Sequence, residues 1–251
     1  MAVAYSGGVD STLLLKVAHD ILKDQVTAFT AQSSIHPARE FQETVEFVRS
    51  AGIRHIIIQS KELENKAFTD NSPDRCYLCK YALFSRIKKE ALRRHIQNIA
   101  EGSNIDDQND YRPGMRAIQE LGIISPLQDA GLHKDDIRKL SKKMGLLTWD
   151  KPAFACLASR FPYGVKITRE RLAMVEKAEQ YLLDLGFKNV RVRYHGDTAR
   201  IEVAETERRK FFNVQLMNDV NAALREIGFA YVALDLKGYR TGSLNEVLHM
   251  K

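Results

Sequence analysis

Three cysteines are the only thiols of the chain, and their spacing suits the binding of a metal or an iron–sulfur cluster. Cys76 and Cys79 form a Cys-x-x-Cys pair, and Cys156 follows from a distant part of the sequence. Two thiolates separated by two residues can chelate one metal ion or one cluster, and the third completes a set of three. On a cluster of four irons, three protein ligands leave one iron open to an exogenous ligand such as sulfide. Cys76, Cys79 and Cys156 are therefore our candidate catalytic and metal-ligating residues.

Other interpretations of the cysteines stay open at this point. A cysteine is commonly a small buried apolar residue, which suits the isolated Cys156 better than it suits the pair. Cys76 and Cys79 could also form a redox disulfide or carry persulfide chemistry. A structural zinc would want a fourth ligand, for which the candidates are His36, His95 and His133. The glycine loop described next favours the cluster over disulfide or persulfide chemistry, and both over zinc.

A second candidate site is the glycine loop Ser6-Gly7-Gly8-Val9-Asp10-Ser11-Thr12. It follows an apolar run at 2–5 and opens an apolar-periodic segment at 13–18, which is the order strand, glycine turn, helix. Two glycines let the backbone approach an anion, and the N–H groups and hydroxyls at a helix start then cradle phosphate. A Walker loop would need Gly-Lys-Ser/Thr after a longer spacer, and the sequence has none there. The alternative is a simple turn between two core elements. The residues we expect to bind nucleotide phosphates are Ser6, Gly7, Gly8, Asp10, Ser11 and Thr12.

The elements around this loop alternate between short strands and helices. Strand-like runs lie at 26–30, 55–58 and 96–100, and helical patterns lie at 40–51 and about 81–94. This alternation predicts an α/β fold with a parallel sheet, in which ligands bind at the carboxyl ends of the strands. Polar loops at such ends are Ser6 onward, 32–34 and 101–104. We expect these loops to converge on one crevice, which adds Gly102 to the nucleotide site.

The pattern changes after about residue 166. Helical segments at 168–185 and 205–227 are separated by a predicted hairpin of strands at 190–194 and 199–203, and a further strand follows at 231–235. We therefore predict an α/β domain with a parallel sheet over 1–166 and a smaller α+β domain over 167–251 with a short antiparallel sheet. Arg191 and Arg193 share one face of the first hairpin strand, and Arg200 lies across from them. They form either an exposed sheet face or a clamp on a substrate phosphate.

Bulk composition limits the class of protein. With 251 residues, 44% hydrophobic and 28% charged, the chain is typical of a globular enzyme. It has neither a spanning apolar run nor a signal-peptide pattern, so we expect a cytoplasmic protein without a membrane partner. The net charge of +6 favours anionic partners, yet no long Lys/Arg run demands nucleic acid. Because a predicted central strand begins almost at Met1, we also expect residues to precede it.

The loop Ser-Gly-Gly-Val-Asp-Ser resembles the pyrophosphatase loop of the ATP-pyrophosphatase superfamily, whose members cleave ATP to AMP and pyrophosphate. Together with the cysteines, it makes the chain similar to the LarE family of ATP-dependent sulfur transferases, which help to build the nickel-pincer nucleotide cofactor. The matching segments are 6–12, 71–74, 109–114, 159–164 (Ser-Arg-Phe-Pro-Tyr-Gly) and 190–195 (Val-Arg-Val-Arg-Tyr-His). They follow one another along essentially the whole chain.

This resemblance implies a two-step reaction. The enzyme adenylylates a carboxylate of pyridinium-3,5-biscarboxylate mononucleotide, and sulfur then displaces AMP to give a thiocarboxylate. Some members sacrifice one cysteine, whereas others hold a [4Fe-4S] cluster with three and use external sulfide. This chain resembles the cluster type, although a sacrificial role for Cys156 stays open. Arg160 is expected in the active site because it lies next to Cys156, and Mg²⁺ is expected on the oxygens of ATP. The resemblance favours the phosphate clamp by Arg191 and Arg193 and implies a homo-oligomer, such as a hexamer.

Three rival functions accompany this hypothesis. A tRNA thiolase of the same superfamily also pairs such a loop with Cys-x-x-Cys and would account for the positive charge. An amide-forming ligase, of the kind that makes NAD or GMP, would not need three cysteines. A nucleotide sensor without catalysis is the most distant alternative. Within the loop, Asp10 either holds Mg²⁺ or serves the helix start and the order of the loop.

Overall fold

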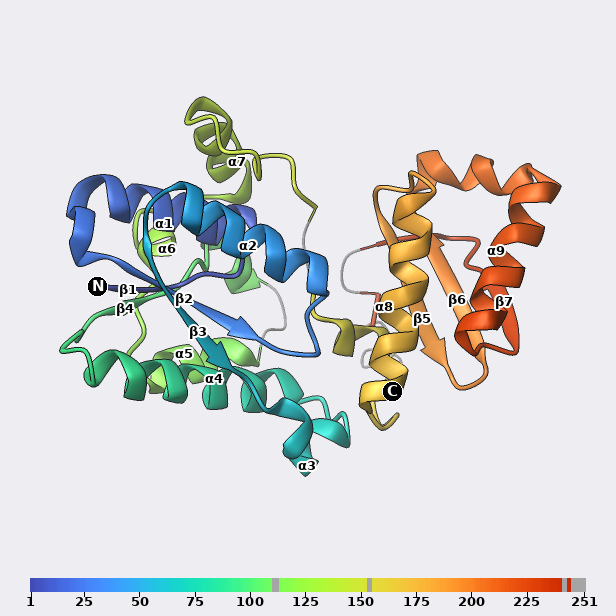
Figure 1. Ribbon diagram of the computed structural model, residues 1–251, viewed down its shortest axis with the longest axis horizontal. Coiled ribbons are helices and arrows are strands. Elements are labelled where there is room, and N and C mark those ends of the chain that lie inside the picture. The colour runs from blue at the N-terminus through green and yellow to red at the C-terminus, as the bar shows by residue number, and fades with distance from the viewer. Residues whose placement is uncertain (110–112, 153–154, 241–242, 245–251) are drawn as a thin grey trace. The chain divides into compact units, whose positions relative to one another are not determined.

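The computed structural model describes residues 1–109, 113–152, 155–240 and 243–244 of the chain (Figure 1). It divides into two compact units, which are described separately. The first unit is formed by Met1–Phe68 and Pro73–Phe154, and the second by Thr69–Ser72 and Ala155–Lys251. Residues 110–112 of the matching segment 109–114 lie outside the described residues. Among the described helices, none combines the length and the apolar character that a membrane crossing requires.

The division differs from the sequence-based boundary after residue 166, because residues 155–166 and a tetrapeptide from much earlier in the chain belong to the second unit. Asn71 is fully buried in that tetrapeptide and adopts a positive φ of 57°. Its side-chain Nδ2 donates to the carbonyl of Pro162 at 2.7 Å, and its own carbonyl accepts from the N–H of Gly164 at 3.0 Å. The N–H of Ile167 donates to the carbonyl of Thr69 at 2.8 Å. These bonds fix the tetrapeptide against the Ser-Arg-Phe-Pro-Tyr-Gly segment.

A four-stranded parallel sheet forms the centre of the first unit, in the order β3-β2-β1-β4. Its strands are β1 Ala2–Ala4, β2 Thr27–Gln32, β3 Arg54–Gln59 and β4 Ile99–Ala100. β1 lies between β2 and β4, so the glycine loop follows an inner strand. The α/β prediction is confirmed for this unit.

Helices cover both faces of this sheet (Figure 1). Side chains from α1, α2, α6 and α7 form one apolar cluster with the sheet, and side chains from α4 and α5 form another. The α-helices of the unit are α1 Val9–Leu22, α2 Ala38–Ser50, α3 Lys66–Thr69, α4 Arg75–Leu92, α5 Gly114–Glu120, α6 Pro126–Asp129 and α7 Lys134–Lys143. Short 3₁₀ turns are η1 Lys23–Gln25, η2 Glu62–Glu64 and η3 Ile105–Asn109. The helix expected from about residue 81 begins at Arg75 instead, so Cys76 and Cys79 lie in its first turns.

The second unit packs two helices against a three-stranded sheet of order β5-β6-β7. Its elements are η4 Leu157–Arg160, α8 Arg169–Asp184, β5 Val190–His195, β6 Thr198–Val203, η5 Glu205–Phe212, α9 Val214–Ile227 and β7 Tyr231–Leu234. The hairpin β5–β6 is antiparallel as expected, but β7 pairs with β6 in parallel, so the prediction of an antiparallel sheet was wrong for this strand. The crossover through α9 brings the chain back to the end of the sheet at which β6 began, which makes a parallel pairing.

The helix expected over 205–227 is divided into η5 and α9. Asn213 separates the two, because its side-chain oxygen accepts a hydrogen bond from the N–H of Leu216 at 3.1 Å and caps α9. Thr168 caps α8 in the same manner through the N–H of Arg171. Local side-chain capping of this kind sets where both helices begin.

Candidate functional site

The glycine loop between β1 and α1 has a shape that other residues would not tolerate. Gly7 has a φ of +76°, and a Cβ added there would lie 2.6 Å from Oγ1 of Thr44 on α2. Gly8 precedes α1 as its N-cap residue, and it has no side chain to cover the first N–H groups of the helix. The loop thus presents backbone donors where a phosphate group would bind.

Hydroxyl groups within the loop hold it in shape. Ser6 Oγ lies 3.1 Å from Ser11 Oγ, and the N–H of Ser6 donates to the same oxygen at 3.3 Å. The hydroxyls of Ser11 and Thr12 donate to the carbonyl of Gly8 at 3.2 and 2.8 Å. Thr12 is fully buried. These bonds give the hydroxyls of Ser11 and Thr12 a structural role. The direct contacts to phosphate that we expect of these hydroxyls stay predictions.

The loop after β4 approaches the start of α1 closely. A Cβ on Gly102 would lie 2.9 Å from the backbone nitrogen of Ser11 and 3.2 Å from the carbonyl carbon of Asp10. Only glycine permits this approach, since backbone atoms cannot yield as a flexible side chain can. The strand ends of β1 and β4 therefore meet, as the sequence analysis expects. The loop after β2 instead bonds to the one after β3, through Ser33 Oγ and Glu62 Oε2 at 2.7 Å.

Asp10 joins three parts of the first unit. Its carboxylate accepts from Nδ2 of Asn104 at 3.1 Å and from Nζ of Lys134, the first residue of α7, at 2.5 Å. The carboxylate thus ties the start of α1 to the loop after β4 and to α7. This arrangement favours the loop-ordering role of Asp10, and a contact to Mg²⁺ stays a prediction.

A lysine that the sequence analysis did not single out lies beside the same loop. Nζ of Lys151 is 2.5 Å from Oε2 of Glu40, 2.8 Å from Oε2 of Glu43 and 3.3 Å from the carbonyl oxygen of Gly7. Burial disfavours its charged form, but hydrogen bonds to Glu40 and then Glu43 raise the pKa of Lys151 above its ordinary value. Its backbone carbonyl accepts from Arg138 Nη2 at 2.8 Å. The feature of the sequence that could have indicated these contacts of Lys151 is the spacing of Glu40 and Glu43 on one helix.

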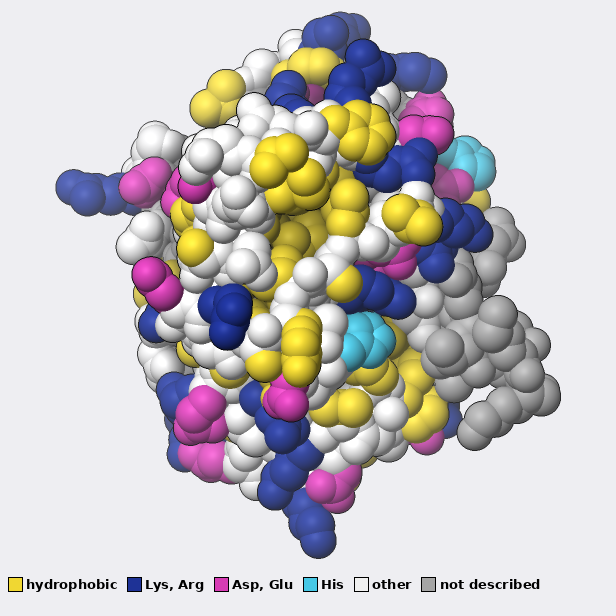
Figure 2. All heavy atoms as spheres, turned by 90° about the vertical axis from the view of Figure 1, so that its right-hand side faces the viewer, with side chains coloured by type: hydrophobic (Ala, Val, Ile, Leu, Met, Phe, Trp, Pro, Cys, Tyr) yellow, Lys and Arg dark blue, Asp and Glu magenta, His cyan; other side chains and the backbone are white. Residues whose placement is uncertain are grey.

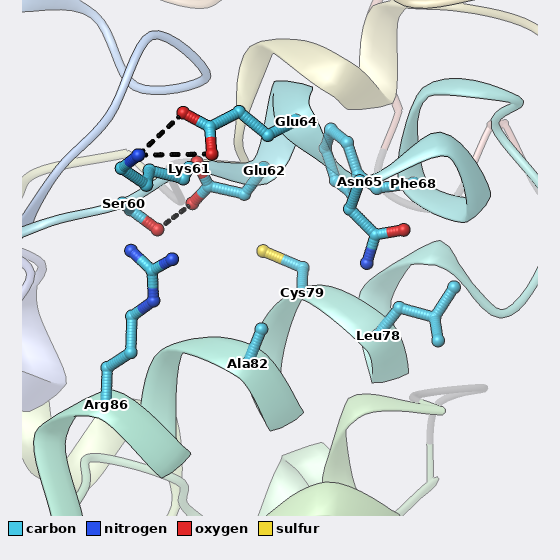
Figure 3. A pocket seen from close by; sticks show the side chains of 10 residues that line it. All are labelled: Ser60, Lys61, Glu62, Glu64, Asn65, Phe68, Leu78, Cys79, Ala82 and Arg86. Carbon is cyan, nitrogen blue, oxygen red and sulfur yellow. Dashed lines mark hydrogen bonds and ion pairs between the residues drawn. The ribbon is translucent and has the colours of Figure 1, made fainter. Parts of the chain in front are cut away.

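Cys76 and Cys79 lie within one turn at the beginning of α4, Cys76 exposed and Cys79 partly buried. All three cysteines of the chain are thiols rather than disulfides. The Sγ atom of Cys79 points into a pocket at the end of β3 (Figure 3). Polar side chains that line this pocket with Cys79 are Ser60, Lys61, Glu62, Glu64, Asn65 and Arg86. Within the described ranges, no group of three or more His, Cys, Asp or Glu side chains forms a metal site.

Arg160 of the second unit lies entirely within its core, against Glu179 of α8. Its Nε and Nη2 donate to the two carboxylate oxygens of Glu179 at 2.8 Å each, and Oε1 of Glu179 also accepts from the N–H of Val192. Nη1 of Arg160 donates to the carbonyls of Ala155 at 2.7 Å and Cys156 at 3.1 Å. The guanidinium group therefore holds the backbone at Cys156 rather than presenting its charge at the surface.

Arg191 and Arg193 are both buried, so the interpretation as an exposed sheet face is wrong. Arg193 donates to Oε2 of Glu202 at 2.7 Å and to the carbonyl of Ser159 at 2.8 Å. Arg200 pairs directly with Arg193 across the hairpin and bonds to the other oxygen of Glu202 at 2.9 Å. Two guanidinium groups thus share one buried carboxylate.

Arg191 lies among charged groups of both signs. Nη1 of its side chain donates to the carbonyl of Val190 at 2.8 Å. Burial, and then the positive charge of Arg160, lower the pKa of Arg191 below its ordinary value. The phosphate clamp by Arg191 and Arg193 stays a prediction.

The chain is 40% identical over 250 residues to the pyridinium-3,5-bisthiocarboxylic acid mononucleotide synthase of Lactiplantibacillus plantarum, covering 99% of this chain and 90% of that protein. The chain belongs to the LarE family. The resemblance seen in the sequence is thereby confirmed, and with it an enzyme that transfers sulfur at the expense of ATP. An uncharacterised protein of Synechocystis is 42% identical over 246 residues, with 98% of this chain and 92% of that protein covered. No family model matches the chain.

This LarE chain is also similar, at lower identity, to glutamine-hydrolysing GMP synthases. The glutamine-hydrolysing GMP synthase of Nitratidesulfovibrio vulgaris is 23% identical over 199 residues, which cover 70% of this chain and 38% of that enzyme. The match fits the ATP-pyrophosphatase superfamily, to which the glycine loop had pointed. The use of ATP by this LarE chain is consistent with a loop that offers backbone donors at the end of an inner strand.

Proposed function

We propose that this LarE chain uses ATP to adenylylate a carboxylate of pyridinium-3,5-biscarboxylate mononucleotide and then exchanges oxygen for sulfur to give the thiocarboxylate. The observation that carries this proposal is the glycine loop of Gly7 and Gly8 at the start of α1, which Gly102 approaches closely, in a chain whose relative is named for the bisthiocarboxylic product. An alternative is a tRNA thiolase of the same superfamily, which the Cys-x-x-Cys pair together with the glycine loop and the net charge of +6 also fit. Salt-sensitive, tight binding of tRNA would favour that alternative.

The chemistry explains why ATP is needed. A carboxylate is a poor acyl electrophile, whereas an acyl adenylate carries AMP as a good leaving group. Backbone N–H groups at the start of α1 would stabilise the charge that moves onto pyrophosphate as the adenylate forms. Mg²⁺ would accompany the phosphate oxygens, with Asp10 as our candidate ligand. In the second unit, Arg191 and Arg193 would bind the phosphate of the mononucleotide.

We propose Cys76, Cys79 and Cys156 as the ligands of a [4Fe-4S] cluster, because thiolates are the usual ligands of such clusters. Two of the thiols lie one helical turn apart, and Cys79 faces a pocket with room beside its sulfur (Figure 3). When bound, such a cluster supplies an open iron that can hold sulfide. Arg160 would act through its bonds to the Cys156 backbone and so fix where that thiol lies. Sacrifice of the Cys156 sulfur is the competing proposal for the source of sulfur.

Mass spectrometry distinguishes the two sources of sulfur. We expect incubation with ATP, sulfide and the pyridinium substrate to yield a product heavier by one exchange of oxygen for sulfur, with an intact polypeptide. A polypeptide lighter by the mass of hydrogen sulfide would instead support sacrifice of a cysteine. Release of AMP and pyrophosphate without any sulfur-containing product would contradict the proposed function.

Metal analysis tests the cluster itself. Protein purified without oxygen should contain iron and acid-labile sulfide, and the Cys76→Ala variant should lose most of both, because two thiolates hold a cluster far more weakly than three. Ser85→Ala, on the same helix α4, is the matched control and should retain the iron. Iron-free wild-type protein under these conditions would count against the cluster.

A homo-oligomer in the cytoplasm completes the proposal. The face of the second unit drawn in Figure 2 carries a group of hydrophobic side chains between basic ones. Exposed large hydrophobic residues of η5, α9, β7 and the residues after β7 are Phe212, Val214, Met217, Tyr231 and Leu236. Apolar patches of this kind commonly mark sites of association, which supports contact between copies of this chain.

A further inference from the structure

The chain turns sharply after β7 and returns to the end of β6. Oδ1 of Asp235 accepts hydrogen bonds from the N–H of Lys237 at 2.9 Å and from that of Gly238 at 2.8 Å. Gly238 has a φ of +77°, and a Cβ there would lie 2.5 Å from the carbonyl oxygen of Val203, the last residue of β6. Only glycine therefore lets the turn lie against this strand. The same contacts fix the position of the next residue, Tyr239.

Tyr239 brings an aromatic ring to Arg191. Its N–H donates to the carbonyl of Val203 at 2.9 Å, and its side chain is half-buried. Cζ of Arg191 lies over the ring, 5.2 Å from its centroid. An aromatic face attracts a guanidinium group, and it accepts none of the hydrogen bonds that the in-plane N–H groups donate. The ring therefore holds Arg191 without competing with an anion for those donors.

Carboxylates hold the neighbouring arginines in another way. Glu179 binds Nε and Nη2 of Arg160 with its two oxygens, and Glu202 accepts from Nη2 of Arg193. Arg160 and Arg193 repel the charge of Arg191, whereas Glu179 attracts it. A carboxylate that bonded Arg191 at both nitrogens would occupy the N–H groups that a phosphate needs. An aromatic ring is thus the partner that suits an arginine which binds an anionic ligand.

A buried donor of Arg193 indicates that an anion belongs beside these arginines. Nε of Arg193 is buried and has no hydrogen-bond partner in the described part of the chain. Its Nη2 donates to Oγ of Ser243 at 2.8 Å as well as to Glu202. Nearly all buried donors in proteins are satisfied, so this Nε points to an acceptor that arrives with a ligand. A phosphate can bond to Nε and Nη2 together, as the Glu179 carboxylate does on Arg160.

We propose that Tyr239 is a positioning residue of the substrate site, whose ring holds the guanidinium group of Arg191 in the orientation that binds the phosphate of the mononucleotide. The inference rests on the proposed function, because it takes Arg191 and Arg193 as the phosphate clamp. Tyr239 acts through Arg191 and does not itself bind the phosphate. Its backbone is fixed before any ligand arrives, which lowers the ordering cost of binding.

Calorimetry with two ligands tests the proposal: pyridinium-3,5-biscarboxylate mononucleotide and the corresponding nucleoside. In the Tyr239→Leu variant, binding of the mononucleotide should weaken about three- to thirtyfold, as expected for loss of one partly buried cation–π contact. The nucleoside has no phosphate for Arg191, so its binding should stay within about twofold of the wild type. Tyr239→Phe should bind the mononucleotide as the wild type does, since the ring is retained. Tyr181→Leu, on α8 of the same unit, is the matched control and should leave both affinities unchanged.

A double variant shows whether the ring acts through the arginine. Once Arg191 is replaced in Arg191→Met, adding Tyr239→Leu should weaken binding of the mononucleotide no further, whereas independent effects would multiply. Equal weakening of the mononucleotide and the nucleoside by Tyr239→Leu would show a structural role and overturn the inference. An equal loss of affinity in Tyr239→Phe would assign the effect to the hydroxyl and overturn it too.

Failure of the proposed function gives a different result. If the wild-type protein bound no pyridinium mononucleotide, the proposed function would fail first, whereas unchanged binding in Tyr239→Leu would overturn the inference alone. Should Tyr239→Leu not fold, Tyr239→Met, whose longer side chain fills more of the same space, replaces it. The same difference between the two ligands is expected of it.

Discussion

Replacement of Arg160 with methionine should reduce the stability of the second unit by about 3–5 kcal/mol, the usual cost of breaking a buried ion pair. The substitution leaves the carboxylate of Glu179, only 8% exposed, without its bidentate partner. It also deprives the carbonyls of Ala155 and Cys156 of their donor. Hydrogen exchange of peptides from α8 and β5 measures the loss. α8 carries Glu179, and β5 carries Val192, whose backbone N–H also donates to the Glu179 carboxylate.

Arg209→Met is the control for this substitution, since Arg209 is exposed on η5. It removes the same charge from the same unit and should leave exchange nearly unchanged. The double variant Arg160→Met with Glu179→Met should recover part of the stability, because an apolar pair can replace a buried ionic one. Equal protection in the Arg160 and Arg209 variants would show that the ion pair is not what holds the backbone of Cys156.

The Gly7→Ala variant should lose ATP-dependent pyrophosphate exchange at least about hundredfold, because small displacements of a phosphate-binding group are that costly. Two causes act together at this position. The φ of +76° is unfavourable for alanine, and its Cβ would lie 2.6 Å from Oγ1 of Thr44. Since Thr44 is on α2, relief of the contact must move the loop or the helix. Isotope exchange between pyrophosphate and ATP measures the effect.

Gly52 provides the matched control for this prediction. It has a similar φ of +67°, but a Cβ there would meet nothing within 4 Å. Gly52→Ala should therefore show only the cost of the backbone conformation, about 1–2 kcal/mol, with exchange activity retained. Adding Thr44→Ala to Gly7→Ala removes the hydroxyl and should restore part of the activity. If the double variant gained nothing, the contact with Thr44 would not be the cause.

The sequence predicted the structure best where a single local pattern determines the order of the elements. The run from Ser6 to Thr12 predicted strand, turn and helix, and the observed β1, Gly7, Gly8 and α1 follow that order. The alternation of elements likewise predicted the parallel sheet. Gly102 was named from its place after a strand, and its approach to Ser11 follows because the ends of neighbouring parallel strands meet.

The sequence analysis did not predict features that depend on residues far apart in the chain. Lys151 stands alone between Asp150 and Pro152, and its two glutamates and the loop are brought to it only by the fold. The direction of β7 depends on the path of the α9 crossover, which no pattern within the strand reveals. The early start of α4 was missed because charged residues surround the cysteines and obscure the apolar period. The burial of Arg160 depends on Glu179, a carboxylate that comes from another element.

The tetrapeptide Thr69–Ser72 has a consequence for biosynthesis. Its partners begin beyond residue 160, so the ribosome delivers it long before they exist. Until then the buried amide of Asn71 has no carbonyls to bind, and the nascent second unit cannot close. The chain must therefore keep this short stretch accessible while the first unit folds. A polypeptide cut after residue 154 would leave the second unit incomplete, since its tetrapeptide would stay on the piece that carries the first unit.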